Sequence, residues 1–66
     1  MALQDFQQQV VDEKAALDEK IKKLGIFFDS AVYHNLSYVD QEILYRQFNC
    51  MKPYSAVLGE RIKRFE

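Results

Sequence analysis

The chain has 66 residues, of which 48% are hydrophobic and 29% charged, with two glycines, one proline and a net charge of −1. This length allows a single domain, residues 1–66, and the composition is typical of a helical protein rather than a disordered or strand-rich one. The near-neutral charge excludes a general electrostatic attraction to DNA or to a membrane surface.

Cys50 and His34 are the only cysteine and the only histidine in the chain. One cysteine cannot form an internal disulfide and fits a reducing compartment, and the pair offers no metal-ligand spacing. The N-terminal residues lack the segments of a signal peptide, and no apolar run is long enough to span a membrane. Without a catalytic triad, a paired-carboxylate cleft or a phosphate loop, the sequence predicts a cytoplasmic protein that is no enzyme and needs no cofactor or metal.

The first segment, from about residue 2 to about residue 28, has the periodicity of an amphipathic helix. Gly25 is expected to lie inside this helix because Phe28 continues its apolar stripe. The apolar residues recur at spacings of three, four and seven, and they are Leu3, Phe6, Val10, Leu17, Ile21, Leu24 and Phe28.

A short linker, residues 29–37, is expected to turn the chain back. Ser37 and Asp40 resemble a capping box at the start of a second helix, which is predicted from about residue 38 to about residue 65. Pro53 lies inside this helix, and its missing N–H would leave the Asn49 carbonyl unbonded at a cost of ~3 kcal/mol. The second helix is therefore expected to be kinked or broken near Pro53.

Two long helices and a short linker predict an all-α fold, an antiparallel two-helix hairpin. Ordering such a chain costs ~100 kcal/mol, which requires burial of ~4,000 Å² of apolar surface. Because a lone hairpin buries one stripe per helix, we expect the hairpins to self-associate into a helical bundle, at least a dimer. The second helix supports this, since its apolar residues cover ~180° rather than the ~100° of a surface helix. These residues are Ile43, Leu44, Phe48, Cys50, Met51, Val57, Leu58, Ile62 and Phe65, with Cys50 expected as a small core residue.

Polar residues interrupt the apolar stripes at four positions. Gln47, Tyr54 and Arg61 are spaced seven apart within the apolar arc of the second helix, and Lys14 lies at the edge of the first stripe. If the hairpin folds near His34, Lys14 is level with Tyr54, and Arg61 lies ~10 Å further along. We therefore expect Lys14, Gln47, Tyr54 and Arg61 to line one groove.

Two cations without nearby acids suit a phosphate-bearing ligand, and the tyrosine ring suits stacking on a base. This makes an anionic, nucleotide-like small molecule the expected ligand. The alternative is structural, because a polar residue in a helical seam can set register and oligomeric state. Lysine and arginine can also lay their stems across a core and keep their charges in water.

The segments "QQVVDEKAALDEKIKKL" and "QFNCMKPYSAVLGERI" resemble a family of small phage proteins first grouped from crAss-like phages. Gln9 stands where that family usually has an arginine, and Pro53 is not part of its pattern. The matching residues of the first half are Val10, Glu13, Lys14, Leu17, Lys20, Ile21, Leu24 and Phe27, and those of the second half are Gln47, Met51, Tyr54, Leu58, Arg61 and Ile62.

That family is similar to the helical-hairpin domain of phage sponge proteins that act against CBASS and Thoeris defence. The resemblance implies an oligomer, between a dimer and a hexamer, that binds a cyclic nucleotide or cyclic ADP-ribose signal in the host cytoplasm without cleaving it. Two other functions are kept open: a helical inhibitor or adaptor that binds a host protein, and a purely structural oligomer.

Overall fold

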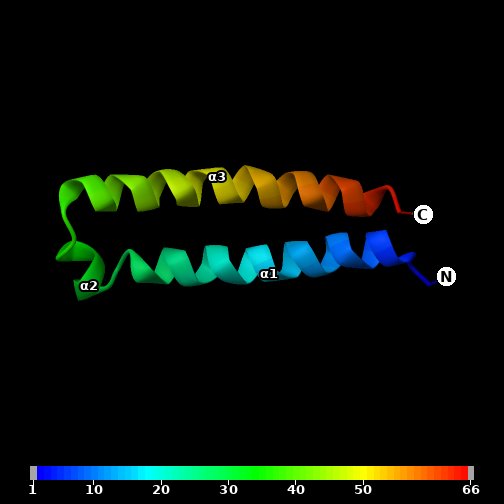
Figure 1. Cartoon of the computed structure of the whole chain (residues 1–66), viewed down its shortest axis with the longest axis horizontal. Coiled ribbons are helices and arrows are strands. Elements are labelled where there is room, and N and C mark those ends of the chain that lie inside the picture. Colours follow the sequence, from blue (N-terminus) through cyan, green and yellow to red (C-terminus); the bar gives the residue numbers. More distant parts are fainter. Residues whose placement is uncertain (1, 66) are drawn as a thin grey trace.

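The computed structural model describes residues 2–65, which form three helices and no strand: α1 (Asp5–Phe27), α2 (Ala31–His34) and α3 (Tyr38–Lys63). The long helices α1 and α3 run antiparallel and lie side by side, and both chain ends lie at the end opposite α2 (Figure 1). The molecule is a rod of 49 × 15 × 14 Å. The predicted all-α class and the pairing of two long helices are confirmed.

The helix ends follow from local hydrogen bonds. α1 begins three residues later than predicted, at Asp5, where the Gln4 backbone N–H donates to Gln7 Oε1 at 3.0 Å. Such a bond satisfies one of the backbone groups that a helix end leaves without a partner. Gly25 lies within α1, as predicted. A Cβ there would lie 3.6 Å from the Phe48 ring, an ordinary van der Waals contact, so the packing against α3 does not itself require glycine at this position.

The linker contains a helical turn, α2, that the sequence did not predict. Ser30 begins it, because its Oγ accepts the Tyr33 N–H at 3.1 Å. Ser37 begins α3 as predicted, with its Oγ accepting the Asp40 N–H at 3.2 Å. The Gln41 side chain donates to the Tyr33 carbonyl at 2.9 Å and so joins the linker to the first turns of α3. These bonds reverse the chain direction within a few residues.

Pro53 does not break the second helix. α3 is one continuous helix from Tyr38 to Lys63 with Pro53 inside it, so the predicted break is wrong, while a kink stays a prediction. Pro53 is exposed, and its ring therefore displaces water rather than packed side chains. The missing hydrogen bond is tolerated because the flanking turns of α3 are held against α1.

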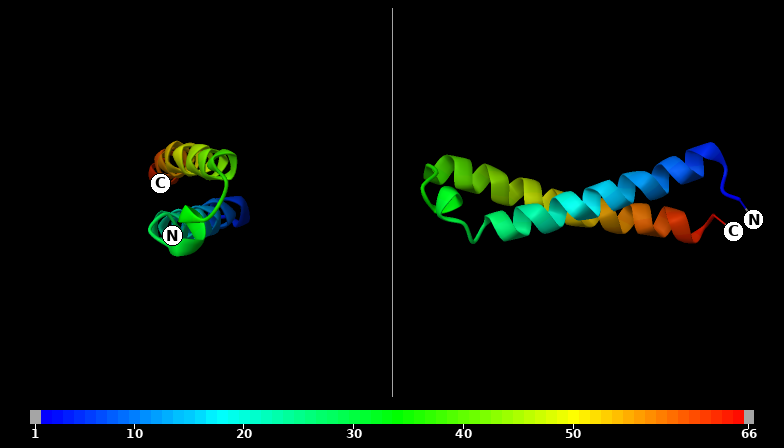
Figure 2. Two further views of the ribbon diagram at one scale, coloured as in Figure 1. Left: turned by 90° about the vertical axis from the view of Figure 1, so that its left-hand side faces the viewer. Right: turned by 90° about the horizontal axis from the view of Figure 1, so that it is seen from below.

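The core is a single seam between α1 and α3, in which the contacting residues alternate at spacings of three and four, as in a coiled coil. Figure 2 shows the two helices crossing at a shallow angle along this seam. Leu58 is 1% exposed at its centre. Cys50 is exposed on the single hairpin and lies outside this seam, so its burial in the core of a bundle stays a prediction. The residues of the core are Val10, Leu17 and Leu58, with Ile21, Met51, Ile62 and Phe65 packed against them.

Leu58→Ala tests the importance of this seam. The substitution is expected to lower the free energy of unfolding by about 2–5 kcal/mol, because it leaves a cavity where the side chain is fully enclosed. Ile26→Ala is the matched control, since Ile26 is 64% exposed and its loss should cost within about 0.5 kcal/mol. The measurement is urea unfolding followed by circular dichroism. Equal losses for the two variants would contradict the assignment of the core.

Candidate ligand-binding site

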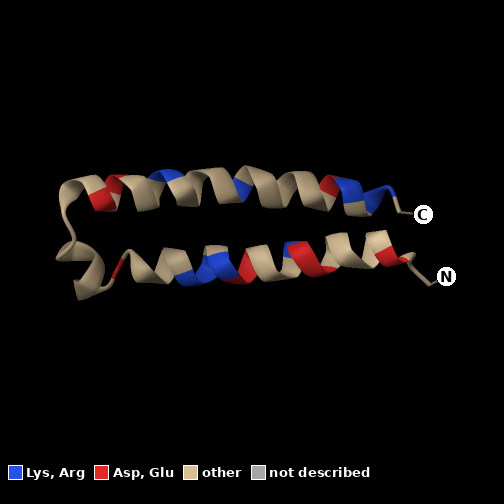
Figure 3. Cartoon of the chain, in the orientation of Figure 1, with Lys and Arg blue, Asp and Glu red and all other residues tan. Residues whose placement is uncertain are grey.

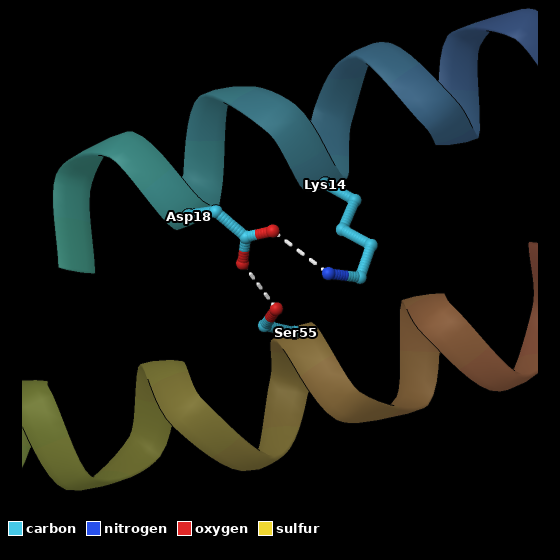
Figure 4. A network of polar contacts seen from close by, with 3 residues as sticks. All are labelled: Lys14, Asp18 and Ser55. Atoms are coloured by element: carbon cyan, nitrogen blue, oxygen red, sulfur yellow. Dashed lines mark hydrogen bonds and ion pairs between the residues drawn. The ribbon is translucent and has the colours of Figure 1, made fainter. Parts of the chain in front are cut away.

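A polar cluster of three residues joins α1 to α3 (Figure 4). Lys14 Nζ donates to Asp18 Oδ2 at 2.7 Å, and Ser55 Oγ of α3 donates to the other carboxylate oxygen of Asp18. Ser55 is 8% exposed, so its hydroxyl needs this partner. Lys14 was expected from the sequence to have no nearby acid, but in the structure it pairs with Asp18.

The stem of Lys14 lies over Gly59. A Cβ at Gly59 would be only 3.2 Å from Lys14 Cε, so the absence of a side chain there makes room for the lysine. Lys14 is 30% exposed at its side chain and Asp18 47%, so the pair is partly solvated. The cluster therefore orients Lys14 within the hairpin rather than presenting a free cation.

The same cluster lowers the pKa of Asp18 below its ordinary value of 3.8. The hydrogen bond from Lys14 is the largest cause and the hydrogen bond from Ser55 the second, and desolvation of the carboxylate opposes both. Both bonds favour the charged form of the carboxyl group. Asp18 is consequently ionised across the neutral pH range and keeps Lys14 paired.

The other three predicted residues lie together on the exposed side of α3. Gln47, Tyr54 and Arg61 are all exposed, and Tyr54 keeps 46% of its surface accessible. Within residues 2–65 the three side chains form one hydrogen bond, a weak one from Gln47 Nε2 to the sulfur of Met51 at 3.9 Å. Their polar groups are therefore available to a ligand.

Between these three residues runs a row of exposed apolar residues, Ile43, Cys50 and Val57, also spaced seven apart. The two rows interleave at spacings of four and three, which is the pattern of a second coiled-coil seam on α3. We call it the outer stripe, and its members are Ile43, Gln47, Cys50, Tyr54, Val57 and Arg61. α1 does not cover the outer stripe.

Within one subunit, Lys14 does not share a side of the hairpin with Arg61. Lys14 lies against Gly59, and two residues along a helix turn the side-chain direction by ~200°, so Gly59 and Arg61 point to opposite sides of α3. Tyr54 lies on the side of Arg61, seven residues earlier. The structure thus brings together Gln47, Tyr54 and Arg61 and places Lys14 across the seam from them.

Lys20 of α1 was missed as a candidate by the sequence analysis. Phe6 contacts Phe65 edge to face, with ring centroids 6.3 Å apart, and Phe65 lies four residues beyond Arg61 on the same face of α3. The stripe of α1 that begins at Phe6 and continues at intervals of seven to Glu13, Lys20 and Phe27 therefore borders the Tyr54 side of α3. This heptad spacing was the signal available in the sequence.

Basic residues are concentrated in the middle of α1 and at the C-terminal end of α3 (Figure 3). No group of three or more histidine, cysteine, aspartate or glutamate residues within residues 2–65 is placed to hold a metal ion. None of the helices in this range combines the length and the apolar character needed to cross a membrane. The groups that the exposed side of α3 offers to a ligand are the cation of Arg61, the ring of Tyr54 and the amide of Gln47.

Comparison with known proteins gives two matches. The sequence model of the Sequestin family matches residues 4–64. An uncharacterized 7.5 kDa protein of Enterobacteria phage T4, from the denB-rIIB intergenic region, is 39% identical over 61 residues, which are 92% of this chain and 95% of that protein. No solved structure matches. The resemblance to small phage proteins is confirmed, whereas the assignment to the crAss-like group stays a prediction.

Asp18→Asn tests the polar cluster through its pH dependence. A carboxyl group with a lowered folded-state pKa contributes stability above its unfolded pKa and loses it as the pH falls through the folded value. Wild type should therefore melt at a higher temperature than Asp18→Asn near pH 7, and the difference should shrink as the pH falls below 3.8. Glu42→Gln, an exposed acid on α3, is the control and should keep the wild-type profile. A melting difference that is the same at pH 3 and pH 7 would contradict the pairing.

Proposed function

The chain belongs to the Sequestin family, and from that premise we propose that it is a phage anti-defence protein that sequesters a cyclic nucleotide or cyclic ADP-ribose-type immune signal without cleaving it. The observation that carries the proposal is the exposed polar row of the outer stripe, in which Gln47, Tyr54 and Arg61 recur every seven residues. The family name supports binding rather than catalysis. The chemistry of this row suggests the class of ligand.

Each residue of the row offers one element of nucleotide recognition. Arg61 presents a planar guanidinium that matches two phosphate oxygens. Tyr54 is 46% exposed and offers a ring face for stacking with a base, and the Gln47 amide can donate to and accept from its edge. Lys14, the fourth predicted residue, would have to leave Asp18 to reach a ligand. The proposed binding residues of α3 are therefore Gln47, Tyr54 and Arg61.

We further propose that a second copy of the chain covers the outer stripe. Among the hydrophobic side chains of residues 2–65, a single hairpin buries only Val10, Leu17 and Leu58, while Ile43 and Val57 remain 47% and 50% exposed. A chain of this size needs additional apolar burial to be stable, and a row of apolar residues at heptad spacing is suited to another helix. Self-association would supply that burial.

The polar row occupies a useful position in such an assembly. Around the circumference of α3, the polar row lies between the apolar row of the outer stripe and the seam with α1. A helix of a second copy that packs on the apolar row would therefore come close to both α3 and α1 near the polar row. A ligand held there would be enclosed on several sides, as small-molecule sites commonly are. Enclosure supports sequestration, because a molecule withdrawn from solution cannot reach its receptor.

A second candidate function is binding to a host protein through the outer stripe. The exposed apolar residues Ile43, Cys50 and Val57 favour it, because an amphipathic face of this kind can also accept a helix from another protein. Binding of this type does not use a nucleotide. The two functions therefore differ in their response to small anionic ligands.

The ligand class is tested by thermal denaturation of the purified chain with cyclic dinucleotides, cyclic trinucleotides and cyclic ADP-ribose, each well above the expected Kd. One class should raise the melting temperature by several degrees, because ligand at about 100 times its Kd adds about 2.7 kcal/mol to the stability of the bound state. The recovered ligand should be chemically intact by mass spectrometry. A chain that responds to none of these compounds, or that cleaves one, would contradict the proposal.

Self-association is tested with Val57→Lys. The new charge lies in the apolar row, four residues before Arg61, and should lower the oligomeric mass measured by light scattering at micromolar concentration. Ile26→Lys is the matched control, since Ile26 is 64% exposed on α1 outside both stripes and should leave the mass unchanged. A wild-type chain that is a stable monomer would overturn the assembly.

A further inference from the structure

We infer that Lys20, and not Lys14, is the cation of α1 that binds the anionic ligand, together with Tyr54 and Arg61 of α3. The inference rests on the proposed function and names the residues that complete its site. It assigns Lys14 a structural role, as part of the polar cluster with Asp18 and Ser55. Lys20 is exposed on α1.

The first support is the side of the hairpin on which Lys20 lies. Phe6 and Phe65 contact one another, which shows that the stripe of α1 containing Phe6 faces the side of α3 that carries Arg61. Lys20 lies in this stripe, fourteen residues after Phe6, or two heptads. In an antiparallel helix pair with this repeat, residues that flank the seam on one helix lie opposite the residues that flank the same side of the other.

The second support is the register along the rod. Asp18 contacts Ser55, Gly25 faces Phe48, and each step forward on α1 corresponds to one step back on α3. This register places Lys20 level with Pro53, the residue before Tyr54. Arg61 lies seven residues beyond Tyr54, or ~10 Å at 1.5 Å per residue. Two long cationic side chains separated by this distance can reach one phosphate or two phosphates of the same ligand.

The third support is the lack of a competing acid on the same helix. The residues three and four positions from Lys20 are Ala16, Leu17, Lys23 and Leu24, and none is acidic. The same is true of Arg61, whose neighbours at these positions are Val57, Leu58, Arg64 and Phe65. Lys14 and Lys23, by contrast, pair with Asp18 and Glu19. The two ion pairs found in residues 2–65 leave Lys20 and Arg61 with their charges uncompensated.

Lys20, Tyr54 and Arg61 together would form the binding surface on this side of the hairpin. Lys20 Nζ and the Arg61 guanidinium would donate to phosphate oxygens, and the Tyr54 ring between them would stack on a base. Glu13, which the register places level with Glu60, the residue before Arg61, forms no ion pair with Arg61 within 4.0 Å in the part of the chain described. Arg61 is accordingly free to turn toward a ligand.

The experiment measures the affinity of wild type and three lysine variants by calorimetry, using as probe the cyclic compound that gives the largest thermal shift. Lys20→Ala should weaken binding about tenfold or more, as expected for loss of a charge-assisted hydrogen bond, and Lys20→Arg should retain most of the affinity. Lys22→Ala is the matched control, because Lys22 is exposed on α1 but points ~200° away from Lys20, and its affinity should equal that of wild type. Lys14→Ala should lower the melting temperature while preserving the affinity.

Three results would overturn the inference. Lys20→Ala could bind the probe as tightly as wild type, or Lys14→Ala could lose binding while its oligomer remains intact, or Lys20→Ala and Lys22→Ala could weaken binding equally, which would indicate a general charge effect. The first two place the cation elsewhere while leaving the proposed function standing. Failure of wild type to bind any of the cyclic probes would reject the proposed function and this site with it.

Discussion

Two long helices can cover only one stripe of each other, and this constraint governs the whole molecule. α1 and α3 meet along a single seam whose centre is Leu58, and three hydrophobic residues within residues 2–65 are buried. Part of the apolar surface that α3 leaves exposed, including Ile43 and Val57, lies in the outer stripe. A short hairpin with this much exposed apolar surface gains stability from further burial, so the same constraint that shapes the fold supports self-association.

The fold was largely predictable because its signals are local. The apolar repeat, the Ser37 cap and the tolerance of Gly25 within α1 depend on residues only a few positions apart, and the structure agrees with each. α2 was missed because one turn of helix leaves almost no periodic pattern, and the Ser30 cap was its only signal. The break at Pro53 was wrong because the cost of proline was weighed without the packing of the neighbouring turns against α1.

The site was harder to predict, because it depends on which side of each helix faces the other. Cys50 belongs to the outer stripe, and a helical wheel cannot tell whether α1 covers that stripe or the stripe that contains Leu58. Asp18 lies four residues from both Lys14 and Lys22, so its partner could not be chosen from spacing alone. In the structure Asp18 pairs with Lys14, because Ser55 of α3 holds the Asp18 carboxylate and Gly59 leaves room for the Lys14 stem. That choice removes Lys14 from the group that the pattern suggested.

A polar residue beside a helical seam can have a structural role or a binding role, and in this hairpin the two roles are assigned to opposite sides of the seam. On one side, Lys14 is neutralised by Asp18 and joined to α3 through Ser55, which is how a polar group fixes helix register. On the other side, Tyr54 and Arg61 have no such partners within residues 2–65, and they lie beside the surface proposed for a second copy. A ligand bound there would contact the subunit junction and, by mass action, stabilise the oligomer that encloses it. Capture and assembly would then reinforce each other, which suits the sequestering role proposed for this chain.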